Sequence, residues 1–507
     1  MEHQEGCWAV CPECLGLGKK SRKLRKKVKL RYQKALDAFE KSNGEGLAPV
    51  RPQGHLEDCV KCAGSGLLAM ATFPVADTEN FPHVAIVGGG IGGVALAVAC
   101  LHRGIPFTLY ERDSGFEARS QGYGLTLQQA TKAVEGLGLF SLEAGVVSTR
   151  HLVHTTQGEV VGEWGMRKWM QSDEQTPQKL SSSKRTNVHI ARQSLRLALL
   201  GQLDGQLNDP LGDQVRVQWN HQLVDFKETE ADGVELMFHV KNPQKGSVNE
   251  ERKVVKADLL VGADGIRSVV RKQLIGEKTT PLRYLGCIVI LGICPLKDLN
   301  GFESDLLDSA TVFQTANGNE RIYIMPYDAE SVMWQLSFPM PEEDAKALSA
   351  QGVTALKEEA CKRTQWHDPI PQILAATLET HISGYPVYDR TLLDAALLAK
   401  GKSITLIGDA AHPMSPFKGQ GANQALLDAL ALARSITKGC QPPSEWQEDW
   451  RKIGIRDSVL TDFEAEMLAR SAVKVKGSAE AAEFLHSDVV LHEGNEPRGR
   501  CLNRNEG

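Results

Sequence analysis

No apolar run in this sequence is long enough to cross a membrane, although 42% of its 507 residues are hydrophobic. The N-terminus also lacks the apolar core of a secretory signal, because charged residues and cysteines interrupt it. Both absences favour a cytoplasmic protein. The length exceeds what one hydrophobic core usually organises, so two or three domains are expected.

The cysteines do not suit a disulfide framework, since their number, eleven, is odd and five of them fall within the first 62 residues. Four of these five form two copies of one pattern, CxxCxGxG, at residues 11–18 and 59–66. Two CxxC turns can direct four thiolates at one tetrahedral ion, and glycine permits the tight backbone that follows. The pattern predicts a structural Zn²⁺ site with Cys11, Cys14, Cys59 and Cys62 as ligands. It resembles the paired zinc knuckles of DnaJ-type chaperones; a redox-active cluster of reduced thiols is the alternative.

The net charge of −5 conceals a strongly basic segment, because Lys19–Lys34 carries ten lysines and arginines and no acidic residue. Leu24, Val28, Tyr32 and Phe39 recur at helical spacing across and beyond this segment, which predicts a helix with an apolar stripe and a basic opposite face. Such a face could bind nucleic acid or an anionic surface. The alternative, which we favour, is a solvated face that balances an otherwise acidic chain.

A dinucleotide-binding fingerprint follows. A short apolar run at residues 83–87 leads into Gly88, Gly90 and Gly93, and a helical pattern continues to about residue 103. Gly88 allows a tight turn, Gly90 lets the backbone approach a pyrophosphate, and Gly93 lets the helix pack on the strand. The phosphates would bind the helix N-terminus. Glu111 ends a second predicted strand, where a carboxylate can accept hydrogen bonds from both ribose hydroxyls.

Two further strand-and-turn motifs lie more than a hundred residues apart. Residues 257–262 predict a buried strand that ends in Ala263-Asp264-Gly265, and residues 403–407 predict another that ends in Gly408-Asp409. The second of these opens the run GDAAHPxxPxxGQGxN at residues 408–423, and a helix is expected from about residue 424 to 437. An aspartate at this strand end can accept a ribityl hydroxyl, and backbone amides at the helix start favour a negatively charged ligand.

The three motifs in this order resemble the single-component FAD-dependent aromatic hydroxylases, the group of para-hydroxybenzoate hydroxylase. The run at residues 384–390, together with the third motif, is similar to the branch that contains the tetracycline-inactivating monooxygenases. The resemblance spans about residues 82–490. It implies an α/β fold in which a Rossmann-like FAD-binding domain (GR2-type) is interleaved with a mixed-sheet substrate domain and followed by C-terminal helices.

The resemblance also implies which residues hold FAD. Glu111 matches the acid at the adenosine ribose, Asp264 the acid associated with FAD phosphates and NADPH docking, and Asp409 the acid at the ribityl chain. Pro416 and Gly419 match a segment beside the isoalloxazine ring. The expected FAD-binding residues are Gly88, Gly90, Gly93, Glu111, Arg112, Arg119, Arg192, Asp264, Gly265, Gly408, Asp409, Pro416, Gly419, Gly421, Ala422 and Asn423.

The activity implied by the resemblance uses FAD, NAD(P)H and O2. NAD(P)H would reduce the flavin, and a flavin C4a-hydroperoxide would then transfer one oxygen to an aromatic or polycyclic phenolic substrate. No second glycine fingerprint for a nicotinamide cofactor is visible, which fits a co-substrate that binds only briefly. No side chain stands out as a general base, and His412 is expected to brace the turn before Pro413.

The substrate is expected on a sheet supplied by residues 279–394. Residues 311–314, 321–326 and 331–338 alternate like half-buried strands. Candidates for the pocket wall are Tyr323, Met325, Trp334 and Gln335.

These assignments predict six regions: a zinc-knuckle module with the basic helix (1–68), a linker (69–81), an FAD-binding domain (82–160, 184–275 and 395–438), a substrate domain (161–183 and 276–394), C-terminal helices (439–490) and a tail (491–507).

Three alternative functions stay open. A flavin-dependent halogenase would be expected to carry a Trp-x-Trp-x-Ile-Pro segment, which is absent. An isoprenoid reductase would commonly expose membrane-facing apolar surface. A zinc- and anion-binding module on a non-catalytic flavoprotein belongs to a different class.

Overall fold

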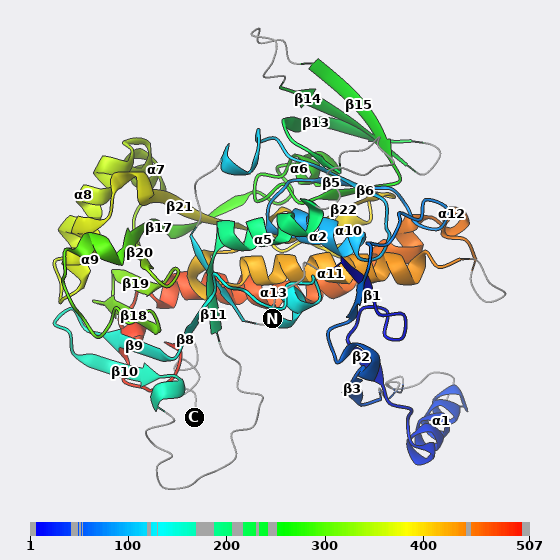
Figure 1. Ribbon diagram of the computed structural model, residues 1–507, viewed down its shortest axis with the longest axis horizontal. Coiled ribbons are helices and arrows are strands. Elements are labelled where there is room, and N and C mark those ends of the chain that lie inside the picture. The colour runs from blue at the N-terminus through cyan, green and yellow to red at the C-terminus, as the bar shows by residue number, and fades with distance from the viewer. Residues whose placement is uncertain are drawn as a thin grey trace. The chain divides into compact units, whose positions relative to one another are not determined.

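The computed structural model describes residues 7–41, 49, 52, 54–118, 123–128, 130–168, 187–204, 216–229, 233–241, 251–442 and 448–498 (Figure 1). The chain divides into two compact units. The first comprises Met1–Ala76 with His102–Gly104, and the second comprises Asp77–Leu101 with Ile105–Gly507.

The first unit contains two small antiparallel ribbons and one helix. Strand β1 (Cys7–Val10) pairs with β4 (Leu67–Met70), and β2 (Lys19–Ser21) pairs with β3 (Leu56–Asp58). Because β4 continues past residue 68, the expected linker at 69–81 begins with a paired strand. Helix α1 (Lys26–Lys41) is the predicted basic helix; its lysines lie exposed, whereas Tyr32 and Phe39 are half-buried.

The second unit is organised around a five-stranded parallel sheet. Its strand order is β12 (Val217–Gln218), β6 (Phe107–Tyr110), β5 (Val84–Val87), β16 (Leu259–Gly262) and β22 (Ile404–Leu406). All residues of β5, β6 and β16 are buried, as expected for parallel strands that are covered on both faces. The helices of this domain are α2 (Ile91–Leu101), α3 (Thr131–Glu135), α5 (Arg192–Asp204), α6 (Val269–Ile275), α10 (Ala395–Leu398) and α11 (Gly421–Gly439). Helix α2 packs against both α5 and α11.

The three predicted motifs each follow one strand of this sheet. Gly88 follows β5, Ala263 follows β16 and Ile407 follows β22. Because the strands are parallel, the motifs lie at the same edge of the sheet, where ligands bind in open α/β folds.

Two antiparallel three-stranded sheets accompany the parallel sheet. One has the order β7 (Gly124–Leu127), β11 (Asn187–Ala191), β8 (Val146–Ser148), and the other has the order β13 (His221–Glu228), β14 (Val234–Val240), β15 (Glu251–Ala257).

A seven-stranded mixed sheet forms the other half of the second unit. Its order is β10 (Val160–Trp164), β9 (Arg150–His154), β18 (Thr311–Ala316), β19 (Arg321–Pro326), β20 (Ser331–Pro339), β17 (Leu282–Pro295) and β21 (Ile382–Arg390). Helices α7 (Glu342–Ala350), α8 (Val353–Arg363) and α9 (Ile370–Ala376) gather on one side of it (Figure 1). Strand β9 pairs in parallel with β18, so residues 150–154 belong to this sheet and not, as predicted, to the FAD-binding domain.

The C-terminal part of the described chain is helical, as predicted. Helix α12 (Trp450–Ile453) and a π-helical turn (Arg456–Leu460) precede α13 (Thr461–Phe484), which contacts both α11 and β17. Among the described helices, none combines the length and the apolar character that a bilayer span requires.

Candidate functional site

The glycines of the first motif have two different environments. A β-carbon at Gly88, where φ is +111°, would lie 2.4 Å from the carbonyl oxygen of Ala263, and one at Gly93 would lie 1.9 Å from that of Gly88. These two positions therefore require glycine so that the turn can pack against strand and helix. At Gly90, however, the nearest atom is Arg192 Nη2 at 3.8 Å. The backbone at Gly90 faces open space, as a site for a pyrophosphate requires.

Glu111 lies directly after β6 and is bound to the first motif. Its Oε2 accepts a hydrogen bond from the Gly89 amide at 2.6 Å, and its Oε1 accepts one from the Asp113 amide at 3.0 Å. The residue is 8% exposed. The neighbouring Arg112 is exposed. Arg119 lies outside the described residues.

Two arginines on one face of α5 reach this turn. Arg192, the first residue of the helix, has its guanidinium 5.8 Å from the ring centre of Tyr123. Arg196, one turn later, donates from Nε to the carbonyl oxygen of Gly89 at 2.7 Å. Sequence reasoning found Arg192 but missed Arg196. The spacing of four residues on a predicted helix could have indicated it, because such residues share a face.

Asp264 caps α6. Its Oδ2 accepts hydrogen bonds from the amides of Val269 at 2.7 Å and Val270 at 3.3 Å. Burial raises the pKa of this carboxyl, and its Oδ1 is buried without a hydrogen-bond partner among the described residues. The next residue, Gly265, has φ of +81°, and a β-carbon there would meet no atom within 4 Å, so its backbone also faces open space.

The third motif places Asp409 where solvent reaches its side chain. Within the described chain, no group donates a hydrogen bond to this carboxylate. Desolvation by the surrounding protein raises the pKa of the Asp409 carboxyl, while the positive charges of His412 and Arg192 lower it in part. A solvent-accessible acid with free acceptor oxygens suits the hydroxyl groups of a ligand.

The turn that carries Asp409 is held from α11. Asp428 Oδ2 accepts hydrogen bonds from the Gly408 amide at 2.8 Å and from His412 Nε2 at 2.7 Å. Asp428 Oδ1 accepts one from Arg470 Nη2 at 2.9 Å. The sequence indicated that His412 braces this turn, but it did not indicate Asp428 as the partner.

The segment at residues 416–423 is fastened to β7. Asn423 Oδ1 accepts hydrogen bonds from the amides of Gln128 at 2.9 Å and Ala130 at 3.3 Å, and its Nδ2 donates to the carbonyl oxygens of Thr126 and Gly419. Asn423 is 1% exposed, so it positions the segment. The residues beside it that face outward are more accessible: Gly419 is exposed, and Pro416, Gly421 and Ala422 are half-buried.

The three motifs lie next to one another. Gly88 contacts Ala263, which joins the first motif to the second. Arg271, on α6, donates from Nη1 to the carbonyl oxygens of Ala410 at 2.9 Å and Ala411 at 2.8 Å, which joins the second to the third. Open backbone at Gly90 and Gly265 and the free carboxylate of Asp409 therefore share one site. This donor and acceptor set fits a phosphate-bearing dinucleotide with a polyhydroxyl chain.

The mixed sheet presents a second face, opposite α7–α9, that we call the inner face. Three cross-strand rows can be followed on it. The first row contains Met325 and Met333, the middle row contains Gln314, Tyr323 and Gln335, and the third row contains Arg321 and Ser337.

Trp334 does not belong to the inner face. It is fully buried in the core beneath α7–α9, and its Nε1 donates to Thr377 Oγ1 at 2.9 Å. Successive side chains of a strand point to opposite faces, so Trp334 and Gln335 cannot line the same pocket. The prediction of Trp334 as a pocket residue is therefore wrong in direction, while Tyr323, Met325 and Gln335 remain candidates.

Neighbouring segments cover the outer rows of the inner face. The Gly124 amide of β7 donates to Met333 Sδ at 3.0 Å in the first row. His486, which follows α13, lies with Nε2 2.8 Å from Ser337 Oγ in the third row. The middle row lies between these covers, and solvent reaches Tyr323 there.

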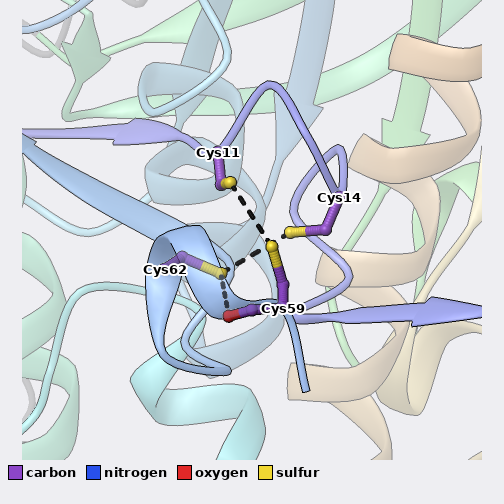
Figure 2. Close-up of side chains that lie close together, drawn as sticks. All are labelled: Cys11, Cys14, Cys59 and Cys62. Atoms are coloured by element: carbon purple, nitrogen blue, oxygen red, sulfur yellow. Dashed lines mark hydrogen bonds between the residues drawn. The ribbon is translucent and has the colours of Figure 1, made fainter. Parts of the chain in front are cut away.

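The four cysteines of the first unit form a separate candidate metal site. Their Sγ atoms all lie within 4.8 Å of one another, and all four residues are buried. The Sγ–Sγ distances are 3.9 Å for Cys11 and Cys59 and 3.7 Å for Cys14 and Cys62, far longer than a disulfide bond. Figure 2 shows the four side chains pointing toward one another from two loops.

The geometry of this cluster suits zinc. Four thiolates at about 2.3 Å from a tetrahedral ion lie about 3.8 Å from one another, which agrees with the two measured separations. Both CxxC turns have left-handed residues after the second cysteine, with φ of +78° at Gly16 and +86° at Gly64. A β-carbon at Gly18 would lie 2.1 Å from the Gly64 carbonyl oxygen, so the paired glycines let the two turns approach closely.

Comparison with known proteins supports the interpretation of the second unit. A family model described as an FAD binding domain matches residues 82–441. Aurachin C monooxygenase/isomerase from Stigmatella aurantiaca is 28% identical over 367 residues, which cover 71% of this chain and 82% of that protein. A 3-amino-4-hydroxybenzoate 2-monooxygenase from Streptomyces platensis is 28% identical over 358 residues, 69% of this chain and 78% of that protein.

Solved structures show the same fold. HpxO from Klebsiella pneumoniae, complexed with FAD and uric acid, has a TM-score of 0.60 at 20% identity, covering 85% of this chain and 94% of its own. The tetracycline destructase Tet(51) has a TM-score of 0.53 at 16% identity, covering 80% of this chain and 92% of its own. The family model matches well over half of this chain, so the chain belongs to the FAD-binding domain family. It is an FAD-dependent monooxygenase.

Proposed function

We propose that this monooxygenase uses NAD(P)H and O2 to hydroxylate an aromatic or polycyclic phenolic small molecule. The observation that carries the proposal is that the three motifs share one site and that β7, which Asn423 of the third motif binds, also contacts Met333 on the inner face of the mixed sheet. This face also bears Tyr323 and Gln335. A relative at 28% identity is named for 3-amino-4-hydroxybenzoate, an aromatic compound. FAD, when bound, supplies the chemistry that takes electrons from NAD(P)H and activates O2.

The chain's own residues would bind and orient the cofactor. Open backbone at Gly90 lies at the start of α2, where unpaired amides and the helix dipole favour phosphate oxygens. Glu111 would accept hydrogen bonds from ribose hydroxyls, and Asp409 from the ribityl chain. The N-terminus of α11, at Gly421, lies next to Asp409 and favours negative charge on the bound ring.

The tyrosines near the site would serve as hydrogen-bond donors. Burial raises the pKa of Tyr323 to about 12, and burial also raises the pKa of Tyr385. Both phenols therefore stay protonated at neutral pH and cannot act as a general base there. They can donate to an oxygen of the substrate or cofactor.

The test compares turnover and FAD content between the purified wild-type protein and its variant Asp409→Ala. NAD(P)H oxidation coupled to O2 uptake, stimulated by an aromatic compound, is the expected result for the wild type. Asp409→Ala should be purified with little bound FAD, because the acceptor for the ribityl hydroxyls is gone. A yellow wild-type protein that never oxidises NAD(P)H with any phenol would contradict the proposal, and full FAD retention in the variant would contradict the role of Asp409.

We further propose that the cysteine cluster holds one structural Zn²⁺, with Cys11, Cys14, Cys59 and Cys62 as its ligands. Four thiolates close the coordination shell and leave no position for a substrate, which is typical of structural sites. Reduced, metal-binding thiols also suit a reducing compartment, in agreement with the expected cytoplasmic location.

A further inference from the structure

Helix α1 of the first unit has an apolar stripe that its own unit covers only in part. Val28, Tyr32, Leu36 and Phe39 recur every three or four residues, so they share one face of the helix. No described side chain of α1 is buried: Tyr32, Leu36 and Phe39 are half-buried, and Val28 is exposed. In the described part of the first unit, the stripe therefore stays accessible to a partner.

The rest of the α1 surface is strongly basic. Residues Lys26–Lys34 include four lysines and one arginine, and all five side chains are exposed. Among the described residues, none of these five cations forms an ion pair with a carboxylate. The cations that do pair precede the helix: Lys20 pairs with Glu13, and Arg22 pairs with Glu57. The basic face of α1 is therefore free to bind an anionic surface.

The two cysteine turns add exposed apolar side chains next to a further cation. Leu17 is 58% exposed and Val60 is 95% exposed. The backbones that carry them are adjacent, because the Cys59 amide donates to the carbonyl oxygen of Gly18 at 2.8 Å. The exposed Lys61 follows Val60 directly. Other exposed large apolar side chains of this unit are Leu15, Leu30, Leu56, Met70 and Val75.

This combination of charge and apolar surface fits a lipid bilayer better than a nucleic acid. An anionic bilayer offers negative headgroups with apolar chains directly beneath them, so both kinds of side chain gain contacts. A single-stranded nucleic acid offers phosphates, but its bases stack on aromatic rings that lie among the cations. The aromatic residues of α1, Tyr32 and Phe39, lie on the apolar stripe and not among the lysines.

We propose that the first unit binds peripherally to membranes that contain anionic phospholipid, through α1 and the exposed tips of the cysteine turns. The lysines of α1 bind the headgroups, while Val28 and Val60 enter the interface between headgroups and acyl chains. The inference does not depend on the proposed function, because the match to the FAD-binding family begins at residue 82. The alternative of a merely solvated basic face predicts no binding to vesicles.

Sedimentation of the purified full-length protein with lipid vesicles tests the inference. The protein should bind vesicles of phosphatidylcholine that contain about 30% phosphatidylserine, and it should bind pure phosphatidylcholine at least about 10-fold more weakly. Binding should fall in about 0.5 M NaCl, because salt screens exposed charges. Absence of binding, or equal binding to both kinds of vesicle, would show that the inference is wrong.

A charge variant and a matched control separate the basic face from the net charge of the protein. The charge variant removes three lysines of α1: Lys27→Gln, Lys29→Gln and Lys34→Gln. Glutamine keeps the helix propensity, and each lost charge should weaken binding to the anionic vesicles about 5-fold, so the total loss is about 100-fold. The control removes three exposed lysines of the second unit: Lys227→Gln, Lys278→Gln and Lys402→Gln. Equal losses in the two variants would overturn the role of α1.

A second variant, Val28→Gln with Val60→Gln, tests insertion into the interface without a change in charge. It should bind the anionic vesicles about 10-fold more weakly, because two exposed apolar side chains no longer leave water. Its FAD content should equal that of the wild type, which shows that the chain is folded. Vesicle binding that this variant leaves unchanged, or tighter binding of a DNA duplex than of the vesicles, would indicate a general polyanion site and overturn the inference.

Discussion

Asp428 holds the turn that carries Asp409, and one of its partners, His412, is titratable. Burial alone would lower the pKa of His412, but the adjacent Asp428 carboxylate raises it above the ordinary value. The pKa of Asp428 is in turn lowered by His412 and Arg470. Both shifts favour the charged form of the pair.

The stability contributed by His412 should depend on pH with a defined sign. Because its folded pKa is raised, the contribution is fully present below the unfolded pKa of about 6.5 and is lost as the pH rises through the folded value. We predict that, as the pH rises above about 6.5, the Tm of the wild type falls more steeply than the Tm of His412→Gln. Parallel pH profiles of the two proteins would contradict a charged pair at this turn.

Single residues were the hardest part of the site to predict from the sequence. Asp409 and Glu111 directly follow predicted strands, so the sequence alone places them at the sheet edge where a ligand is expected. Asp428, Arg196 and Arg271 act through partners that are distant in the sequence, and only the folded chain reveals these contacts. One signal was available: Asp428 interrupts the apolar run of leucines and alanines at residues 425–433 of α11, where a charge must find a partner.

In the turn between β5 and α2, Gly93 and Gly90 have different roles that two alanine variants can distinguish. Gly93→Ala would place a β-carbon against the backbone of Gly88, so we predict a loss of about 1–3 kcal/mol in the free energy of unfolding, even without FAD. Gly90→Ala has room in the protein itself, but its methyl group would project toward the pyrophosphate.

The expected result for Gly90→Ala is an unchanged Tm of the FAD-free protein together with weakened FAD binding. Thermal unfolding of the FAD-free variants and FAD titrations distinguish the two cases. Unchanged FAD affinity in Gly90→Ala would mean that the phosphates do not approach this turn.

Strands could be predicted where a short apolar run ends in a recognisable glycine turn. The apolar runs that became β5, β16 and β22 end in the turns that the sequence marked. The prediction failed where pairing is decided by distant strands, since nothing local in residues 150–154 shows that β9 joins β18. The error at Trp334 was avoidable, because strict alternation already separates it from its neighbour Gln335.

At the scale of the whole molecule, the two compact units carry different ligand chemistry. The family match begins at residue 82 and does not include the cysteine cluster, so this cluster is a feature that the match does not explain. The clustering of the four cysteines and the adjacency of the three glycine motifs could be predicted, because each depends on short motifs with fixed spacing. The sequence analysis ended the first module at residue 68, whereas the compact unit extends to Ala76. This boundary could not be predicted, because β4 belongs to the unit through its pairing with β1, a contact between segments that are distant in the sequence.

The two ligands should therefore be removable one at a time. We predict about one zinc ion per chain by metal analysis of the purified protein, and its loss in the double variant Cys14→Ser, Cys62→Ser, because two ligands cannot close a tetrahedral site. A bound zinc ion would stabilise the unit that holds it, so its loss should lower the thermal stability of the first unit while bound FAD and its absorbance stay unchanged. Asp409→Ala is the reciprocal control and should lose FAD while retaining zinc. Release of FAD on removal of zinc would show that the units are coupled, and a metal-free wild type with reactive thiols would favour the redox alternative for these cysteines.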